Sequence, residues 1–554
     1  MAKSILSVWQ RLVGLLELDK KDILQTIYYA IFAGLVNLSL PLGIQAIINL
    51  IQGAQVSTSW IVLVVLVTLG VAFVGILQLM QIRIIENIQQ RIFTRASFEF
   101  AYRFPRMKMS ELRNYYPPEL ANRFFDTLTV QKGLSKILLD FPAALLQIIF
   151  GLLLLSFYHP FFIIYGLLLL LLVYIVFKFT AQKGLETSLD ESKNKYKVAH
   201  WIQEVARSVI SFKIAGDSNL ALQKNDVLVS KYLGAREGHF RILVFQYIQM
   251  IGFKVLVTAG LLLIGGILVF NQEMNIGQFV AAEIIILLVI SSVEKLIIGL
   301  ETLYDVLTSL EKLGQVVDRD LEVKKNEGIR HRQQFHVELE NVSYSVPERK
   351  KKILRNISMD ITHHSRIVIQ GSGGAGKTTL LKIISGLIKP TDGTMLVNGQ
   401  SIQSISLIEY RSLIGLSLKE ETPFEGSILE NITFGDPNVP RDDVDWAVDV
   451  MGLSNFIVEQ PEGIHTIVYP EGKRLSDTIS RRILLARAIV RKPRLLVLKD
   501  PIELFEEPEA IRLMDFLTDS AHPWGLVVVS QHPLWSQRCN QIILIEDGRT
   551  RTLK

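Results

Sequence analysis

The residues best suited to chemistry lie in one glycine-rich segment. It matches the phosphate-loop pattern G-x4-G-K-[ST], and its residues are Gly371, Ser372, Gly373, Gly374, Ala375, Gly376, Lys377 and Thr378. Glycines let backbone N–H groups surround phosphate oxygens, and the lysine reaches the outer phosphates. A strand-like run (366–370) precedes the segment and a helical run (380–384) follows it, as the motif requires. We predict a nucleotide site in which Thr378 offers a hydroxyl to Mg²⁺ and Thr379 also contacts the nucleotide.

The chain as a whole is far more apolar than an ordinary soluble protein. Of the 554 residues, 49% are hydrophobic and only 20% are charged, and the mean hydropathy is +0.31. Six apolar stretches are each long enough to cross a hydrocarbon core of about 30 Å as a helix. They cover residues 23–51, 59–82, 134–158, 160–180, 242–270 and 277–300. We therefore predict an integral membrane protein surrounded by the lipid bilayer.

Charge and cysteine content limit the other possibilities. A net charge of +5 over this length is too small to indicate a nucleic-acid partner, and the single cysteine, Cys539, excludes an intrachain disulfide. The predicted outer loops (52–57, 158–159 and 271–276) contain no lysine or arginine, whereas the inner connection 83–133 contains many. The positive-inside rule then puts both termini in the cytoplasm and the spans in the plasma (inner) membrane.

The remaining segments suggest how these parts are joined. The inner connections 83–133 and 181–241 are predicted to continue the spans as helices into the cytoplasm. The amphipathic segment 4–20 either lies along the membrane surface or packs against the rest of the protein. Residues 321–334 have the composition of a linker, and short β-rich runs alternate with helices after it. The predicted domains are a transmembrane domain, 1–320, and a soluble α/β domain, 335–554.

Three further segments resemble a known family. The segment 386–399 (GLIKPTDGTMLVNG) follows the phosphate loop, and 39–51 (SLPLGIQAIINLI) and 276–283 (IGQFVAAE) lie in the apolar part. With six spans and two long inner connections, the chain resembles an ABC half-transporter of the type I exporter kind, most like exporters of peptides or secreted proteins. The resemblance implies a membrane all-α six-helix transmembrane domain followed by an α/β P-loop NTPase domain with ATP as its cofactor. It also implies a dimer, formed with a second copy or with a different ABC half-transporter.

The resemblance locates the family's other nucleotide-binding positions, and most carry a different residue type. The aromatic residue that stacks on adenine falls at Val346, with Tyr344 two residues away. The Q-loop glutamine falls at Lys419 and the Walker B aspartate at Lys499. Without the Walker B carboxylate, the anchorage of Mg²⁺ is weakened, so binding of Mg²⁺ is an open question.

Positions linked to hydrolysis are altered as well. The catalytic glutamate falls at Asp500, one methylene shorter, and the switch histidine falls at Gln531, unless a shift of one residue selects His532. The signature, normally LSGGQ, reads LSDTI: Ser476 is kept, but Asp477 puts a carboxylate where a glycine N–H would meet the γ-phosphate. Because misplacement by about 1 Å can cost about 10²-fold in rate, we predict impaired or absent hydrolysis.

The two lysines near the metal position allow two interpretations. Mg²⁺ and an aspartate together contribute one positive charge, whereas Lys419 and Lys499 contribute two. The lysines either screen the β and γ phosphates and repel Mg²⁺, or belong to a decayed site and point to solvent or pair with Glu420 and Asp500. In the first case, nucleotide binding no longer needs Mg²⁺.

Ionisable residues also occur in the last two apolar stretches. Lys254 and Glu294 both lie about 25 Å from the outer membrane edge at the helical rise of about 1.5 Å per residue, so we predict an ion pair or a shared aqueous cavity. Glu283 either belongs to a transport pathway or lies in water beyond the lipid. The resemblance further predicts short coupling helices, near 115–125 and 213–220, that contact the nucleotide domain.

Two functional interpretations follow. The chain is either a transporter subunit that moves a peptide, a lipid or a hydrophobic small molecule, or a non-catalytic subunit that uses ATP as a static ligand in a membrane complex. A P-loop enzyme with a membrane anchor is disfavoured, because six spans exceed what anchoring needs.

Overall fold

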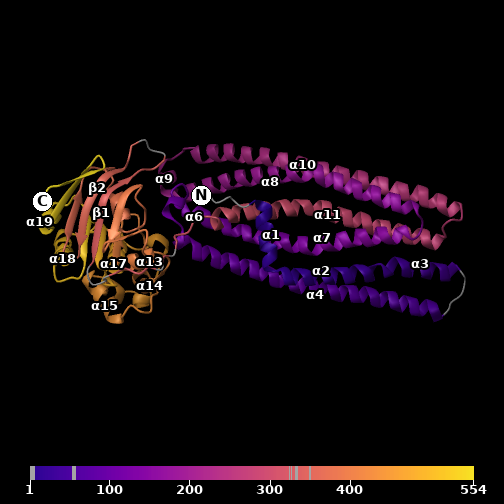
Figure 1. Cartoon of the computed structure of the whole chain (residues 1–554), viewed down its shortest axis with the longest axis horizontal. Helices are drawn as coiled ribbons and strands as arrows, with labels where there is room; N and C mark the ends of the chain where they lie inside the picture. Colours follow the sequence, from indigo (N-terminus) through magenta and orange to yellow (C-terminus); the bar gives the residue numbers. More distant parts are fainter. Residues whose placement is uncertain (1–6, 53–57, 324, 326, 331–334, 348–350) are drawn as a thin grey trace. The chain divides into compact units, whose positions relative to one another are not determined.

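The computed structural model describes residues 7–52, 58–323, 325, 327–330, 335–347 and 351–554. The chain forms two compact units. The first comprises Met1–Met107 and Glu111–Leu321, and the second comprises Lys108–Ser110 and Glu322–Lys554. The first unit is built from helices and the second from strands and helices, which is the predicted fold class (Figure 1).

Most of the first unit consists of helices that run lengthwise beside one another (Figure 1). They are α2 (Lys20–Asn37), α3 (Ser39–Gln52), α4 (Thr58–Arg103), α7 (Asp126–Ser156), α8 (Phe161–Arg207), α10 (Leu220–Phe270) and α11 (Ile276–Val317), and the shorter α1 (Val8–Leu18) crosses them. Short helices occur between them: η1 (Phe104–Arg106), α5 (Met109–Leu112), α6 (Pro117–Ala121), η2 (Asn122–Phe125) and α9 (Val209–Ile214). Among these helices, α7 packs along α11, α8 along α10, and α2 along α4.

Most predicted spans are confirmed by long apolar helices. Within the described residues, five segments are long and apolar enough to cross a membrane: Lys20–Gln52, Thr58–Arg106, Pro117–Ser156, Leu220–Phe270 and Ile276–Val317. The remaining predicted span, 160–180, forms the first part of α8, a single helix of 47 residues. Residues Phe161–Leu171 form an apolar stretch at its start. Large apolar side chains such as Leu66, Leu167 and Leu263 are 58–68% exposed, as expected for helices that face lipid.

The predicted first span is bent within its length. It consists of α2 and α3, which are separated at Leu38. Pro41, the third residue of α3, has no N–H to donate to the carbonyl of Asn37, so the hydrogen-bond ladder is interrupted there. A proline in a membrane span is tolerated when neighbouring helices support the backbone.

Helices α7 and α11 form the close-packed centre of the first unit. A Cβ atom on Gly133 of α7 would lie 2.4 Å from Cγ2 of Val306, and one on Gly299 of α11 would lie 2.4 Å from Cε1 of Phe141. Small residues of this kind let two helix backbones approach closely. Much of α11 is therefore buried, and it provides the surface on which other helices of the unit pack.

The amphipathic N-terminal segment packs against this centre. In α1, Leu12 is 8% exposed and belongs to an apolar cluster that includes Val306 and Leu307 of α11. The guanidinium of Arg11 forms ion pairs with Glu311 and with Asp318, the second at 2.6 Å. Of the two alternatives left by the sequence, the structure favours packing on the body of the protein.

The inner connections are helical, as predicted, with one correction. α4, α8 and α10 continue beyond the apolar stretches, and the first predicted coupling helix corresponds to α6 and η2, with Pro117 at the helix start. Near the second predicted coupling segment, 213–220, the short helix is α9, which ends at Ile214 and so lies mostly before that segment; its coupling role stays a prediction. Gly216, with φ +61°, follows the end of α9 and takes the left-handed conformation that commonly terminates a helix.

The predicted ion pair in the membrane is confirmed. Nζ of Lys254 in α10 lies 2.6 Å from Oε2 of Glu294 in α11, and the two side chains are 38% and 30% exposed. Glu283 is half-buried in α11, and no ion pair joins it to any residue in the described part of the chain. Its role stays open.

The second unit contains three sheets. The six-stranded sheet has the order β12-β11-β3-β10-β9-β6, the four-stranded sheet β2-β1-β4-β5, and the third pairs β7 with β8. The strands are β1 (His336–Tyr344), β2 (Leu354–Thr362), β3 (Arg366–Gln370), β4 (Asp392–Val397), β5 (Gln400–Ser401), β6 (Ile414–Ser417), β7 (Gly426–Ser427), β8 (Ile467–Val468), β9 (Leu495–Lys499), β10 (Gly525–Val529), β11 (Gln541–Glu546) and β12 (Arg549–Thr552). The helices are α12 (Lys377–Ile384), α13 (Leu407–Ser412), α14 (Ile428–Thr433), α15 (Arg441–Val450), α16 (Ser454–Val458), α17 (Asp477–Ile489), α18 (Glu507–Thr518) and α19 (Pro533–Arg538), with single turns η3 (Gly463–His465) and η4 (Pro470–Gly472).

The predicted linker 321–334 is partly built into this second unit. Both carboxylate oxygens of Glu322 accept hydrogen bonds of 2.7 Å from Arg411, and Ile329 is 5% exposed within the core of the unit. The described residues of the segment therefore pack on the α/β fold.

Candidate functional site

Three neighbouring parallel strands bring the predicted nucleotide residues together. β10 pairs in parallel with β3 on one side and with β9 on the other. The phosphate loop follows β3, Asp500 follows β9, and Gln531 lies just after β10, so all three lie at the carboxyl edge of the sheet, where α/β folds bind ligands. A cavity of about 1160 Å³ opens there. It is lined by Val346, Ile353, Gly373, Gly374, Ala375, Gly376, Lys377, Thr378, Thr379, Lys419, Lys499, Asp500, Ile502, Glu503, Phe505, Glu507, Ala510, Val529, Ser530, Gln531 and His532.

The phosphate loop has the backbone that its glycines allow. Gly374 and Gly376 have φ values of +79° and +105°, and a Cβ on Gly371 would lie 2.3 Å from the carbonyl oxygen of Ile545. α12 starts directly after Gly376, so the N–H groups of its first turn are free to bind an anion. The structure thus supplies the phosphate cradle that the sequence predicts, although Gly371 and Ser372 themselves are not among the residues that line the cavity.

The side chain of Lys377 folds back onto the phosphate loop. Its Nζ donates hydrogen bonds to the carbonyl oxygens of Gly371 (2.6 Å) and Ser372 (2.7 Å). Burial lowers the pKa of Lys377, and the positive charge of Lys499 lowers it further. A phosphate group in the cavity would relieve this repulsion.

The two lysines at the metal positions have different environments. Nζ of Lys419 forms an ion pair with Oε2 of Glu503 at 3.0 Å, and the two side chains are 56% and 52% exposed. The ammonium group of Lys499 makes no hydrogen bond or ion pair with any residue in the described part of the chain, although its charge acts on Lys377 and Asp500. One alternative left by the sequence was that the two lysines pair with Glu420 and Asp500. Lys419 pairs with Glu503 instead, and Glu420 lies 3.8 Å from Lys382.

Asp500 occupies a constrained backbone position. Its φ is +45°, and its N–H donates to the carbonyl oxygen of Val529 at 2.8 Å, which fixes the residue between β9 and β10. Burial and the neighbouring charge of Glu503 raise the pKa of Asp500, while Lys499, Lys419 and Lys377 oppose this rise. The carboxyl group faces the same cavity as the phosphate loop.

Both candidates for the switch position line the cavity. Nε2 of Gln531 donates to the carbonyl oxygen of Gly371 at 3.1 Å, so this side chain is tied to the phosphate loop. His532 is exposed, and its backbone N–H donates to Oγ of Ser530 at 3.2 Å. Gln531 and His532, the two alternatives for the switch histidine, therefore both lie at this site.

The predicted adenine and signature residues are placed elsewhere. Val346 lines the cavity together with Ile353, whereas Tyr344 packs against the apolar core of the unit and is not among the lining residues. Ser476 caps α17, its Oγ accepting a hydrogen bond from the N–H of Ile479 at 3.2 Å. It does not line this cavity, as expected if the signature serves the site of a partner subunit.

Several lining residues were not predicted as site residues. Ile353, Phe505 and Glu507 come from a loop before β2 and from the segment that leads into α18. Glu503 lies in the segment that occupies the family's D-loop position, but its pairing with Lys419 spans 84 positions and no local pattern indicates it. A search for acidic residues near the two lysines would have identified Glu503 only as one candidate among several.

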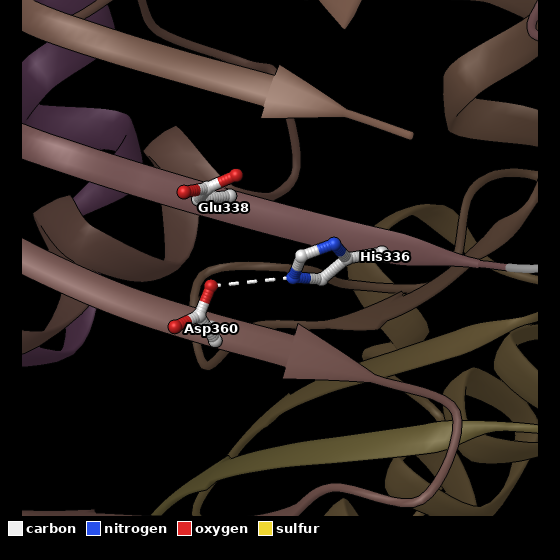
Figure 2. Close-up of side chains that lie close together, drawn as sticks. All are labelled: His336, Glu338 and Asp360. Carbon is white, nitrogen blue, oxygen red and sulfur yellow. Dashed lines mark hydrogen bonds and ion pairs between the residues drawn. The ribbon is translucent and has the colours of Figure 1, made fainter. Parts of the chain in front are cut away.

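A second cluster of possible metal ligands lies on the four-stranded sheet. Figure 2 shows His336 and Glu338 on β1 next to Asp360 on β2. Nε2 of His336 lies 3.2 Å from Oδ1 of Asp360, and one ligand atom from each residue falls within 4.8 Å of the others. Glu338 and Asp360 are in register across the two antiparallel strands, and His336 lies two residues before Glu338 on the same face of β1, so ordinary strand pairing explains the grouping.

Comparison with known families now defines the class of protein. The model of the ABC transporter transmembrane region matches residues 23–293, and that of the ABC transporter matches residues 354–503. The first match lies within the helical unit, and the second contains the phosphate loop, Lys419, Lys499 and Asp500. The chain belongs to the ABC transporter family, and it is an integral membrane protein that carries a transmembrane domain and a nucleotide-binding domain.

Individual relatives match parts of the chain. The uncharacterized ABC transporter ATP-binding protein YfiB of Bacillus subtilis (strain 168) is 29% identical over 43% of this chain and 41% of its own length. The alpha-hemolysin translocation ATP-binding protein HlyB of Escherichia coli O157:H7 is 29% identical over 55% of this chain and 43% of its own length. This chain thus spans less than half the length of these two relatives.

The likeness of fold extends over nearly the whole chain. The solved structure of a bacterial Atm1-family ABC exporter with ATP bound matches with a TM-score of 0.83, covering 96% of this chain and 94% of that one. The sequence identity is 16%, so this match concerns the fold alone.

Proposed function

We propose that this chain is one half of a dimeric ABC exporter that binds ATP but hydrolyses it poorly or not at all at its own site. Its cargo would be a peptide, a lipid or a hydrophobic molecule. The membrane would be the plasma (inner) membrane, with the nucleotide-binding domain and both termini in the cytoplasm. The partner would be a second copy or a different half-transporter.

One observation carries the proposal: a well-formed phosphate loop lines a cavity in which the positions needed for hydrolysis carry unsuitable residues. Lys377 and the N-terminal turn of α12 can hold phosphates. Hydrolysis needs a carboxylate that orients water and a charge arrangement that stabilises the transferred phosphoryl group. Here Asp500 is one methylene shorter than glutamate, burial raises its pKa, and Lys499 replaces an acidic side chain.

The signature segment adds a second obstacle. In the ABC family, each nucleotide lies between the phosphate loop of one subunit and the signature of the other. Asp477, the first residue of α17, would bring a carboxylate close to the γ-phosphate of the opposing site. A homodimer would then have two defective sites, and a heterodimer with an intact partner would have one site without Walker B and one facing LSDTI.

Turnover and binding measured on the same preparation test the proposal. The full chain in lipid nanodiscs should bind a fluorescent ATP analogue saturably, and Lys377→Ala should abolish this binding. Its phosphate release with Mg²⁺ should equal that of Lys377→Ala. Turnover clearly above the Lys377→Ala background would refute impaired hydrolysis, and absence of Lys377-dependent binding would refute the nucleotide-binding role.

A second candidate function is a non-catalytic subunit that holds ATP as a static ligand within a membrane complex. The substitutions in both halves of the family's composite site, Lys499 and Asp477, favour this candidate. Transport assays with the co-purified partner distinguish the two. An exporter half is required for movement of cargo across the bilayer, whereas a scaffold subunit is required only for assembly.

A further inference from the structure

The donor set of the cavity does not suit Mg²⁺. Mg²⁺ takes oxygen ligands in near-octahedral geometry, usually including carboxylates. Thr378 offers a hydroxyl, but the two positions that the ABC resemblance assigns to the surroundings of the metal are Lys419 and Lys499. An ammonium group has no lone pair to give to a metal, and it repels a divalent cation. Three carboxylates line the cavity, those of Asp500, Glu503 and Glu507, and that of Glu503 is already paired with Lys419. The positive charges of Lys499, Lys419 and Lys377 act on Asp500, so a divalent cation bound there would be repelled by three ammonium groups.

The ion pair between Lys419 and Glu503 changes the charge count made from the sequence. That count assigned two positive charges to the lysines, against one for Mg²⁺ with an aspartate. Glu503 also lines the cavity and offsets the charge of Lys419 at 3.0 Å. Lys499 and the Lys419–Glu503 pair together contribute one positive charge, the same as a divalent cation with one carboxylate.

Lys499 carries the positive charge that is not neutralised by a neighbouring carboxylate. It ends β9 beside β10, and it lines the cavity with Lys377 and Thr378. It forms no ion pair within the described part of the chain, so its ammonium group is available to a ligand. Lys377, by contrast, donates to the carbonyl oxygens of the loop.

We propose that this cavity binds the triphosphate of ATP without a divalent cation, with Nζ of Lys499 supplying the positive charge that Mg²⁺ provides in other P-loop sites. This inference rests on the proposed function, because it requires that the domain binds ATP. Because Glu503 neutralises Lys419, the two lysines and Glu503 together carry one positive charge. Lys499 carries that charge and binds the outer phosphates. The ligand is metal-free ATP or another nucleoside triphosphate of the same charge.

The test is equilibrium binding of a fluorescent ATP analogue to the full chain in nanodiscs, with excess Mg²⁺ or with excess EDTA. The wild-type dissociation constant should differ by less than about threefold between the two conditions. Lys499→Asp restores the family's carboxylate, so its binding should become metal-dependent and fall by about tenfold or more in EDTA relative to Mg²⁺. Lys389→Asp, at an exposed lysine outside the cavity lining, is the matched control and should behave as wild type.

A further variant, Lys499→Gln, and the loss of binding in Lys377→Ala make each result decisive. Lys499→Gln removes the charge with little change of size, so it should weaken binding in EDTA even if Lys499→Asp does not fold. A wild-type affinity that falls by about tenfold or more in EDTA overturns the inference while leaving the proposed function intact. Unchanged metal independence in both Lys499 variants overturns the role of Lys499. Absence of Lys377-dependent binding in both conditions overturns the proposed function and this inference together.

Discussion

At the scale of single residues, the charge of the nucleotide cavity depends on contacts between distant parts of the chain. The family resemblance predicted that Lys419, Lys499 and Asp500 belong to one site, because each lies next to a recognisable scaffold segment. It could not predict that Glu503 pairs with Lys419, since that pairing depends on how the segment after β6 folds against the segment after β9. Nor could it predict that Tyr344 points into the core rather than the cavity.

The Lys419–Glu503 pair provides a prediction about nucleotide affinity in EDTA. Glu503→Gln should tighten binding and Lys419→Gln should weaken it, each by about two- to fivefold, because the pair is half exposed and its electrostatic effect is screened. The double variant should return close to wild type, since it leaves the cavity charge unchanged. Titrations at low and high salt check this, and the single-variant effects should shrink at high salt. Weakening by both single variants would contradict the charge count.

At the scale of elements, apolar length and composition predicted the helices well, whereas their ends depend on individual residues. The continuous predicted span 23–51 is divided by Pro41, and the second coupling helix ends before Gly216. The packing of α1 on α11 was left open by its amphipathic pattern, because an apolar stripe faces lipid or protein equally well. The buried ion pairs of Arg11, with partners about 300 positions away, favour packing on protein.

The Lys254–Glu294 pair joins two elements, α10 and α11, and predicts coupled effects on stability. Lys254→Met or Glu294→Gln alone should destabilise the detergent-solubilised protein by about 1–2 kcal/mol, because each leaves one charge unpaired at membrane depth. The double variant Lys254→Met with Glu294→Gln should recover most of this loss. Thermal unfolding of the four proteins checks the coupling, with Lys295→Met, at an adjacent exposed lysine, as the control. Additive losses in the double variant would mean that the pair does not stabilise the bundle.

At the scale of the whole molecule, the two units must communicate if ATP binding is to affect the transmembrane helices. The order of the units followed from the sequence, because the apolar stretches end before the α/β pattern begins. Local sequence patterns do not predict which residues join the units, because such a surface is assembled from segments that are distant in the chain. The family resemblance predicts that coupling helices join them, and α6 with η2 forms the first predicted one.

Photocrosslinking tests this assignment. Phe125 is the last residue of η2, directly before α7, and is 64% exposed. Phe157 directly follows the other end of α7 and is 77% exposed. Replacing Phe125 by benzoylphenylalanine in the full chain should give crosslinks to peptides from residues after 335, because a coupling helix must contact the nucleotide-binding domain to transmit its state. The same replacement at Phe157, on the predicted outer side of the membrane, should give none. Mass spectrometry of the crosslinked peptides reads out both results. Equal yields from the two positions, or no crosslink from position 125 to that domain, would remove this segment from the coupling pathway.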